Sequence, residues 1–86
     1  MIRSKGKMFG ELIRKHITLS PNQVNDFVKA ATKCDFDVDI YYNRYVVDAK
    51  SILGVFGLDL TKPLTVEYRG YDQGFEQYLK GLAVQA

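Results

Sequence analysis

The chain has 86 residues, a net charge of +2, one cysteine and one histidine, and its composition of 47% hydrophobic and 26% charged residues is that of a folded globular domain. A chain this short has room for a single hydrophobic core, and the lone Cys34 excludes an internal disulfide. Cys34 and His16 are too few to hold a structural zinc ion, so we expect no metal site and no cofactor. No apolar stretch is long enough for a membrane span or a signal peptide, which predicts a cytoplasmic protein with no membrane partner.

Positive charge is concentrated near the N-terminus. Residues 1–16 hold five basic side chains against Glu11 alone, whereas the rest of the chain holds seven basic and nine acidic groups. We interpret residues 1–8 as a flexible basic leader and residues 9–86 as a single domain. The leader has no aromatic stacking repeat and no helix-turn-helix pattern, so we expect no direct binding of nucleic acid.

The first part of the domain predicts a strand followed by a helix. Residues 11–19 are rich in β-branched residues and place Ile13, Ile17 and Leu19 on one strand face, although Lys15 shares that face. A helix should start at Ser20, because its hydroxyl can cap free amides, Pro21 fits a first turn and Gln23 can close a capping box. The buried stripe of this helix, which ends near residues 33–34, is Val24, Phe27, Val28 and Ala31.

Two strands and a short helix follow. Residues 36–42 alternate apolar and polar side chains, and the turn Asn43-Arg44 leads into a second strand over residues 45–48. Residues 49–57 predict a short helix that is capped by Ser51 and ends at Gly57.

The C-terminal part predicts one more strand and one more helix. Residues 64–69 alternate again, after the strand breaker Pro63, and Asp72 caps the last helix. The buried face of that helix is Phe75, Tyr78, Leu79 and Leu82. The order strand, helix, strand, strand, helix, strand, helix predicts an α+β sandwich, a mostly antiparallel four-stranded sheet covered on one face by three helices. On this pattern alone a ferredoxin-like fold is an alternative.

One segment resembles a known family. Residues 48–58, Asp-Ala-Lys-Ser-Ile-Leu-Gly-Val-Phe-Gly-Leu, together with residues 27–31 before them and Gly70-Tyr71-Asp72 after them, resemble the phosphocarrier protein HPr family of the bacterial sugar phosphotransferase system. The resemblance covers about residues 11–84. It implies the open-faced β-sandwich of that family and favours this fold over the ferredoxin-like one.

The resemblance also locates the active centre of the family, which this chain lacks. In the family, a histidine at the start of the first helix, in a Gly-Leu-His-Ala-Arg-Pro-Ala pattern, accepts phosphate from Enzyme I and passes it to a sugar permease. The resemblance places Ser20 at the position of the histidine and Asn22 at that of the arginine, so we expect no catalytic residue. A serine phosphate is a stable ester, and His16 lies on a strand without a helix N-terminus to hold a phosphoryl group.

The resemblance assigns a regulatory role to Ser51. In HPr proteins of Gram-positive bacteria a kinase that uses ATP phosphorylates the serine of this motif, and Ser51 stands at that position. A phosphate there would add nearly two negative charges to an apolar surface and alter partner binding without refolding the domain. The plain alternative is that Ser51 only caps its helix.

The same short helix carries the candidate binding patch. Ile52, Leu53 and Phe56 resemble the docking surface that HPr forms with this helix and the first one, whereas Val55 is the member expected in the core. Tyr41, Tyr42 and Tyr45 could extend an exposed aromatic surface. The spacing of Asp35, Asp37 and Asp39 is that of a solvated sheet face rather than a cation site.

We therefore expect an HPr-like regulatory or protein-binding module that is not an enzyme. The resemblance names its candidate partners, which are an HPr kinase, a catabolite-control transcription factor and proteins of the phosphotransferase system. One alternative is a phosphocarrier with a non-standard acceptor such as Ser20 or His16. Another is a structural orphan that retains the fold without partners.

Overall fold

The structure is a computed structural model that describes residues 11–84. The predicted basic leader, residues 1–8, lies outside the described residues. The element order agrees with the order predicted from the sequence: β1 (Ile13–Ile17), the 3₁₀ turn η1 (Pro21–Gln23), α1 (Val24–Thr32), β2 (Val38–Tyr42), β3 (Tyr45–Asp48), α2 (Ile52–Phe56), β4 (Leu64–Tyr68) and α3 (Gln73–Leu82).

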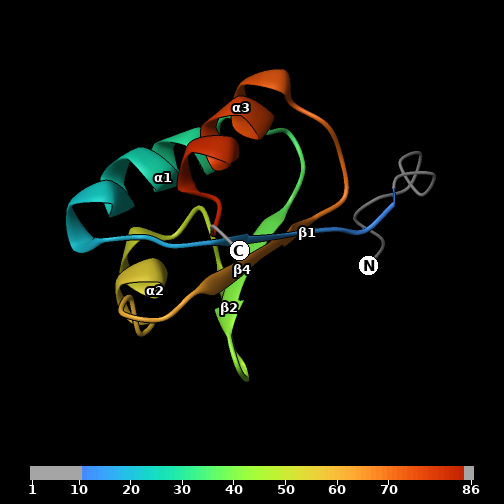
Figure 1. Ribbon diagram of the computed structural model, residues 1–86. Helices are drawn as coiled ribbons and strands as arrows, with labels where there is room; N and C mark the ends of the chain where they lie inside the picture. The colour runs from blue at the N-terminus through green and yellow to red at the C-terminus, as the bar shows by residue number, and fades with distance from the viewer. Residues whose placement is uncertain (1–10, 85–86) are drawn as a thin grey trace.

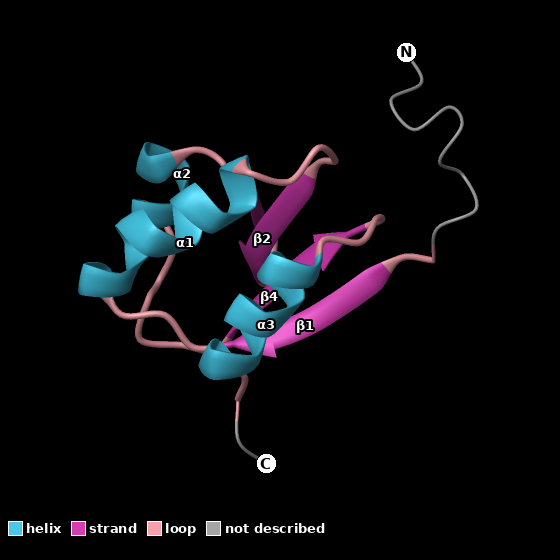
Figure 2. Ribbon diagram, turned by 90° about the horizontal axis from the view of Figure 1, so that it is seen from above, coloured by secondary structure: helices cyan, strands magenta, loops and turns pink. Residues whose placement is uncertain are grey.

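The four strands form one sheet in the order β1-β4-β2-β3, and every neighbouring pair is antiparallel. α1 and α3 lie side by side above the sheet, and α2 lies at the same end of the molecule as the start of α1 (Figures 1 and 2). β1 and β3 are therefore the edges of the described sheet. The C-terminal residues cover part of the β1 edge, because the Val84 amide donates to the His16 carbonyl at 3.0 Å.

The core lies between the sheet and the helices. Leu64, Val66 and Tyr68 of β4 alternate inward and are at most 2% exposed, as the period of two predicts. Phe27 of α1 and Phe75 of α3 close over them, and full burial of an aromatic side chain of this size contributes about 1.5–3 kcal/mol. The Tyr68 ring packs against Phe36 and Phe75, with centroid separations of 5.6 and 5.4 Å.

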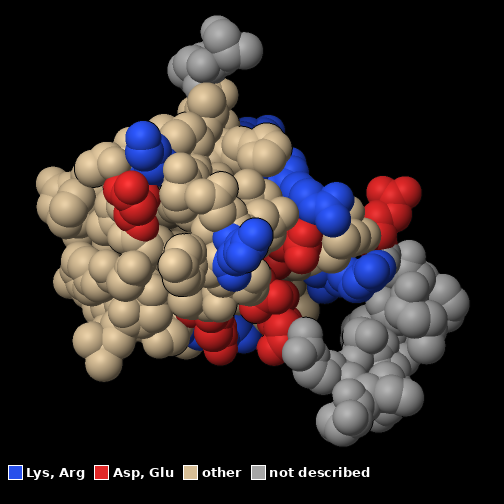
Figure 3. All heavy atoms as spheres, turned by 90° about the horizontal axis from the view of Figure 1, so that it is seen from below, with Lys and Arg blue, Asp and Glu red and all other residues tan. Residues whose placement is uncertain are grey.

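The other face of the sheet is uncovered within residues 11–84. Figure 3 shows that Lys, Arg, Asp and Glu side chains of both signs are interspersed on the molecule seen from this side. One row crosses all four strands, because Arg14 stands opposite Glu67, Glu67 opposite Asp39, and Asp39 opposite Asp48. Asp37 is exposed and Asp39 half-buried in this region, in keeping with a solvated face.

The structure refines three of the expectations. The helix that starts at Ser20 opens with a 3₁₀ turn before the α-helical residues begin at Val24. The second helix contains only the five residues Ile52–Phe56. Tyr41, Tyr42 and Tyr45 do not extend one aromatic surface: Tyr42 pairs with Tyr45 on the helix-covered side, whereas Tyr41 pairs with Val46 on the open side, since successive side chains alternate between faces.

Candidate functional site at the start of α1 and on α2

The start of α1 is built by local hydrogen bonds. The backbone at Ser20 is extended, and its amide donates to Gln23 Oε1 at 2.9 Å, which is the return half of the predicted capping box. The Ser20 hydroxyl lies 2.5 Å from Asn22 Oδ1 and 3.1 Å from Gln23 Oε1. Serine, asparagine and glutamine do not titrate near neutral pH, so these three side chains include no general base that could activate the hydroxyl.

His16 lies apart from this helix start. It stands on β1 opposite Thr65, and its Nδ1 atom is 3.2 Å from Thr65 Oγ1 on the open face of the sheet. The helices cover the opposite face, so the imidazole is separated from the amides at the start of α1 by the sheet itself. The expectation that His16 lies on a strand is confirmed.

Ser51 begins α2 as a true N-cap. Its Oγ atom accepts a hydrogen bond from the Gly54 amide at 3.1 Å, and its side chain is exposed. Gly54 in turn lets α2 approach β3 closely, because a Cβ atom at this position would lie 3.2 Å from Cβ of Val47. The hydroxyl of Ser51 is thus both the cap of the helix and open to solvent.

The apolar side chains of α2 divide as predicted. Val55 is fully buried, whereas the exposed fractions of Leu53, Phe56 and Ile52 are 81%, 47% and 39%. A five-residue helix that packs one side chain inward leaves the others on its outer face, since successive residues are about 100° apart. Ile52, Leu53 and Phe56, here called the α2 patch, form an exposed apolar cluster on a helix that packs against α1.

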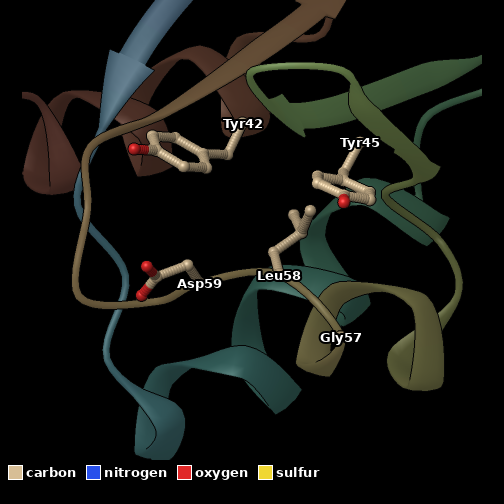
Figure 4. Close-up of a pocket in the computed structure, with 5 residues that line it drawn as sticks. All are labelled: Tyr42, Tyr45, Gly57, Leu58 and Asp59. Atoms are coloured by element: carbon tan, nitrogen blue, oxygen red, sulfur yellow. The ribbon is translucent and has the colours of Figure 1, made fainter.

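A hollow of about 260 Å³ adjoins the C-terminal end of α2. Figure 4 shows Tyr42 and Tyr45 of the β2–β3 hairpin on one side of it and the segment Gly57–Asp59 on the other. Hydrogen bonds from the Thr61 hydroxyl and amide lower the pKa of Asp59, so this wall carries a negative charge. The sequence reasoning missed this hollow, although the two tyrosines that flank a two-residue turn were a signal for it, because such residues share a sheet face.

The part of the chain that the structure describes has neither a metal-ligand cluster nor a membrane-spanning helix. Residues 11–84 contain no group of three or more histidine, cysteine, aspartate or glutamate side chains placed to hold a metal ion. Over the same residues, no helix has the length and apolar character required to cross a membrane.

Comparison with solved structures identifies the fold. No protein-family model matches the sequence, and no curated protein sequence matches it either. The chain is similar in structure to a phosphocarrier protein HPr from Bacillus anthracis strain Ames, with a TM-score of 0.65 and 21% sequence identity, over 85% of this chain and 98% of that chain. The molecule therefore belongs to the α+β open-faced sandwiches. More particularly, it has the HPr-like fold, which confirms the fold predicted from the sequence.

Proposed function

We propose that this protein is an HPr-like docking module that binds a protein partner through the α2 patch and does not relay phosphate through a histidine. The observation that carries the proposal is the 81% exposure of Leu53 on a helix whose Val55 is fully buried. An exposed apolar cluster on a small domain is typical of a surface that a partner covers. The role of the structurally similar protein as a phosphocarrier supports a function in protein–protein contacts.

The chemistry at the start of α1 argues against a carrier or an enzyme. A relay needs a nitrogen nucleophile whose phosphoramidate passes readily to the next protein, and Ser20 offers a hydroxyl that is engaged with Asn22 and Gln23. The alternative acceptor, His16, lies on the other side of the sheet from the helices. In this proposal the protein acts in the cytoplasm by binding and performs no reaction of its own.

Ser51 is the proposed regulatory site. Phosphorylation would place a dianion one residue before Ile52, at the edge of the α2 patch, where it would oppose an apolar partner and favour a basic one. The Gly54 amide that now bonds the hydroxyl is available to a phosphate oxygen, so the helix start can remain formed. The candidate partners are an HPr kinase, a catabolite-control transcription factor and other proteins of the sugar phosphotransferase system.

The first experiment is intact-mass and site-mapping spectrometry after two separate incubations, one with Enzyme I and phosphoenolpyruvate and one with HPr kinase and ATP. We expect one phosphoryl group on Ser51 in the second incubation and none in the first. The matched control is Ser51→Asn, which retains an N-cap acceptor but has no hydroxyl to modify. An acid-labile phosphoryl group in the first incubation would refute the proposal and favour a carrier.

The α2 patch is tested separately by calorimetric titration with a catabolite-control transcription factor. Leu53→Ser should weaken binding at least tenfold, because it removes the most exposed apolar contact, and a tenfold change corresponds to about 1.4 kcal/mol. The control is Tyr71→Ser, which changes a side chain of similar exposure, 71%, outside the patch. Equal binding by the two variants would show that α2 does not carry the interaction.

A further inference from the structure

The backbone N–H and C=O groups on the outer edge of β3 have no partner strand within residues 11–84. β3 stands at the end of the strand order, so among residues 11–84 no strand pairs with its far side. Its side chains are also unusually open for a strand of β-branched and aromatic residues: Tyr45 is 72% exposed and Val46 58%. An edge of this kind is a template for another strand unless charge, proline or a covering segment blocks it.

The direction of the backbone groups on this edge follows from one hydrogen bond. The Ala49 amide donates to the Val38 carbonyl at 2.8 Å, and these residues are opposite one another if the register of Asp39 and Asp48 is continued by one step. Residues along an antiparallel pair alternate between bonded and non-bonded positions. Tyr45 and Val47 therefore bond β2, whereas Val46 directs both its N–H and its C=O away from the sheet.

The edge is complementary to itself. If two copies of β3 run antiparallel with Val46 opposite Val46, then Tyr45 of each copy is opposite Val47 of the other, and Arg44 is opposite Asp48. This register places residues of the same sheet face together and aligns the outward backbone groups. Its cross-strand pairs are aliphatic–aliphatic, aromatic–β-branched and oppositely charged, which are the favourable classes.

Two charged residues are available for such pairing: Arg44, the turn residue just before β3, and Asp48, the last residue of β3. Within residues 11–84 no group hydrogen-bonds or ion-pairs with the Arg44 side chain. Asp48 uses Oδ1 to accept from the Lys50 amide at 2.9 Å and stands directly opposite the like charge of Asp39 on β2. A guanidinium on the other side of Asp48 would offset that repulsion.

The position of α2 adds an apolar contact. Gly54 faces Val47, and Val55 points into the core, so Leu53, two residues before Val55, projects from the side of the helix that faces away from the core. In the symmetric register Tyr45 of the second copy lies opposite Val47, which puts its ring next to Leu53. Among residues 11–84, the most exposed large apolar side chain, Leu53, thus meets the most exposed tyrosine, Tyr45.

We propose that the outer edge of β3 is a self-association site, at which a second copy of this chain adds its own β3 in antiparallel register about Val46. The contact joins two four-stranded sheets into one of eight strands. Because it rests on a few backbone hydrogen bonds and a small number of side chains, it belongs to the weak class of interfaces below about 1,200 Å². It shares Leu53 with the α2 patch, so association and partner binding compete, but it does not depend on the proposed function.

Sedimentation velocity over a concentration series tests association directly. We expect a monomer–dimer equilibrium whose dimer fraction rises toward about 1 mM protein and falls with added salt, because the Arg44–Asp48 pairs are screened. Val46→Lys places two like charges at the two-fold axis and should weaken the dimer at least tenfold. Leu12→Lys adds the same charge next to the opposite edge strand and should leave it unchanged. A monomer at every concentration would overturn the proposal.

Charge exchange and cross-linking test the register. Arg44→Asp should abolish the dimer by facing Asp48 with a like charge, and the double variant Arg44→Asp/Asp48→Arg should restore it. Under mild oxidation Val46→Cys should form a disulfide-linked dimer at least tenfold faster than Tyr45→Cys, because only residue 46 meets its own counterpart, at a Cα separation of about 5.5 Å. Equal cross-linking rates, or a double variant that stays monomeric, would contradict this register.

Discussion

The Tyr68 hydroxyl donates a 2.6 Å hydrogen bond to Oε2 of Glu76 and so ties the interior strand β4 to α3. The other carboxylate oxygen, Oε1, lies 3.7 Å from Nζ of Lys15 on β1. Lys15 is the residue that interrupts the inner face of the first strand in the sequence pattern. Glu76 thus provides the counter-charge that lets a lysine occupy a position facing the helices.

Replacing Tyr68 with Phe should lower the free energy of unfolding by about 1–2 kcal/mol, because a hydrogen bond to a charged group is lost from a side chain that is 2% exposed. Urea denaturation followed by circular dichroism measures the change. Glu76→Gln is the companion variant, since its amide oxygen can still accept from Tyr68. A Gln variant that loses as much stability as the Phe variant would mean that the charge, and not the hydrogen bond, is responsible.

Gly70 should not tolerate a side chain. Its φ angle is +147°, and a Cβ atom there would lie 2.4 Å from Cδ2 of the Phe36 ring, which itself stacks on Tyr68. We expect Gly70→Ala to lower the free energy of unfolding by at least about 2 kcal/mol, through backbone strain and displacement of the ring.

The control for that substitution is Gly81→Ala. A Cβ atom at Gly81 has no neighbour within 4 Å among the described residues, and the position is inside α3. Alanine should stabilise the helix by about 0.5–1 kcal/mol. Thermal unfolding of the two variants should therefore shift in opposite directions, and a destabilised Gly81 variant would contradict this explanation.

Substitutions at Val55 and Leu53 should have different effects, because the first should lower the stability of the fold and the second the affinity for a partner. Val55→Ala removes fully buried methyl groups and should cost about 2 kcal/mol of unfolding free energy, whereas Leu53→Ala should stay within about 0.5 kcal/mol of the unmodified protein. Partner affinity should respond in the reverse order. A strongly destabilised Leu53 variant would show that this side chain serves the fold and not a partner.

Alkaline pH should destabilise the protein, because two buried acids have raised pKa values in the folded state. Burial, with a smaller contribution from Asp72 and an opposing one from Lys50, raises the pKa of the Cys34 thiol from 9.0 to about 11. Burial and the hydrogen bond to Glu76 raise the pKa of Tyr68 as well. Both groups are neutral when protonated, so the unfolded chain releases their protons first. The stability contributed by Cys34 is present below pH 9 and is lost as the pH rises to about 11, and the loss from Tyr68 begins near pH 10 and continues at higher pH.

Guanidinium denaturation at intervals across this pH range checks the expectation. Cys34→Ala should lose less stability than the unmodified protein between pH 9 and about 11, because one of the two buried acids is absent. The same burial predicts slow alkylation of the Cys34 thiol at pH 8, since little thiolate is present in the folded state. A stability that is constant up to pH 11 would show that neither group titrates differently on folding.

Local signals in the sequence predicted the elements well because each depends on near neighbours. Ser51 and Asp72 cap their helices through bonds to amides three residues on, and Asn43 adopts the left-handed backbone, with φ of 55°, that the hairpin turn requires. Helical spacing required that some apolar side chains of α2 face solvent, and the resemblance to the HPr family pointed to Ile52, Leu53 and Phe56, which are the exposed ones.

The sequence by itself determined the caps and the strand alternation, since each depends on residues only a few positions apart, and the family resemblance added the exposed patch on α2. The tertiary structure decided which residues meet across the sheet. The partner of Lys15 is 61 positions away at Glu76, and Asp39 faces Asp48 only once the hairpin register is set. Such pairs depend on strand order, which the period of side chains does not encode. For the same reason, only the structure revealed β3 as an open edge, with Arg44 in the turn before it and Asp48 as its last residue.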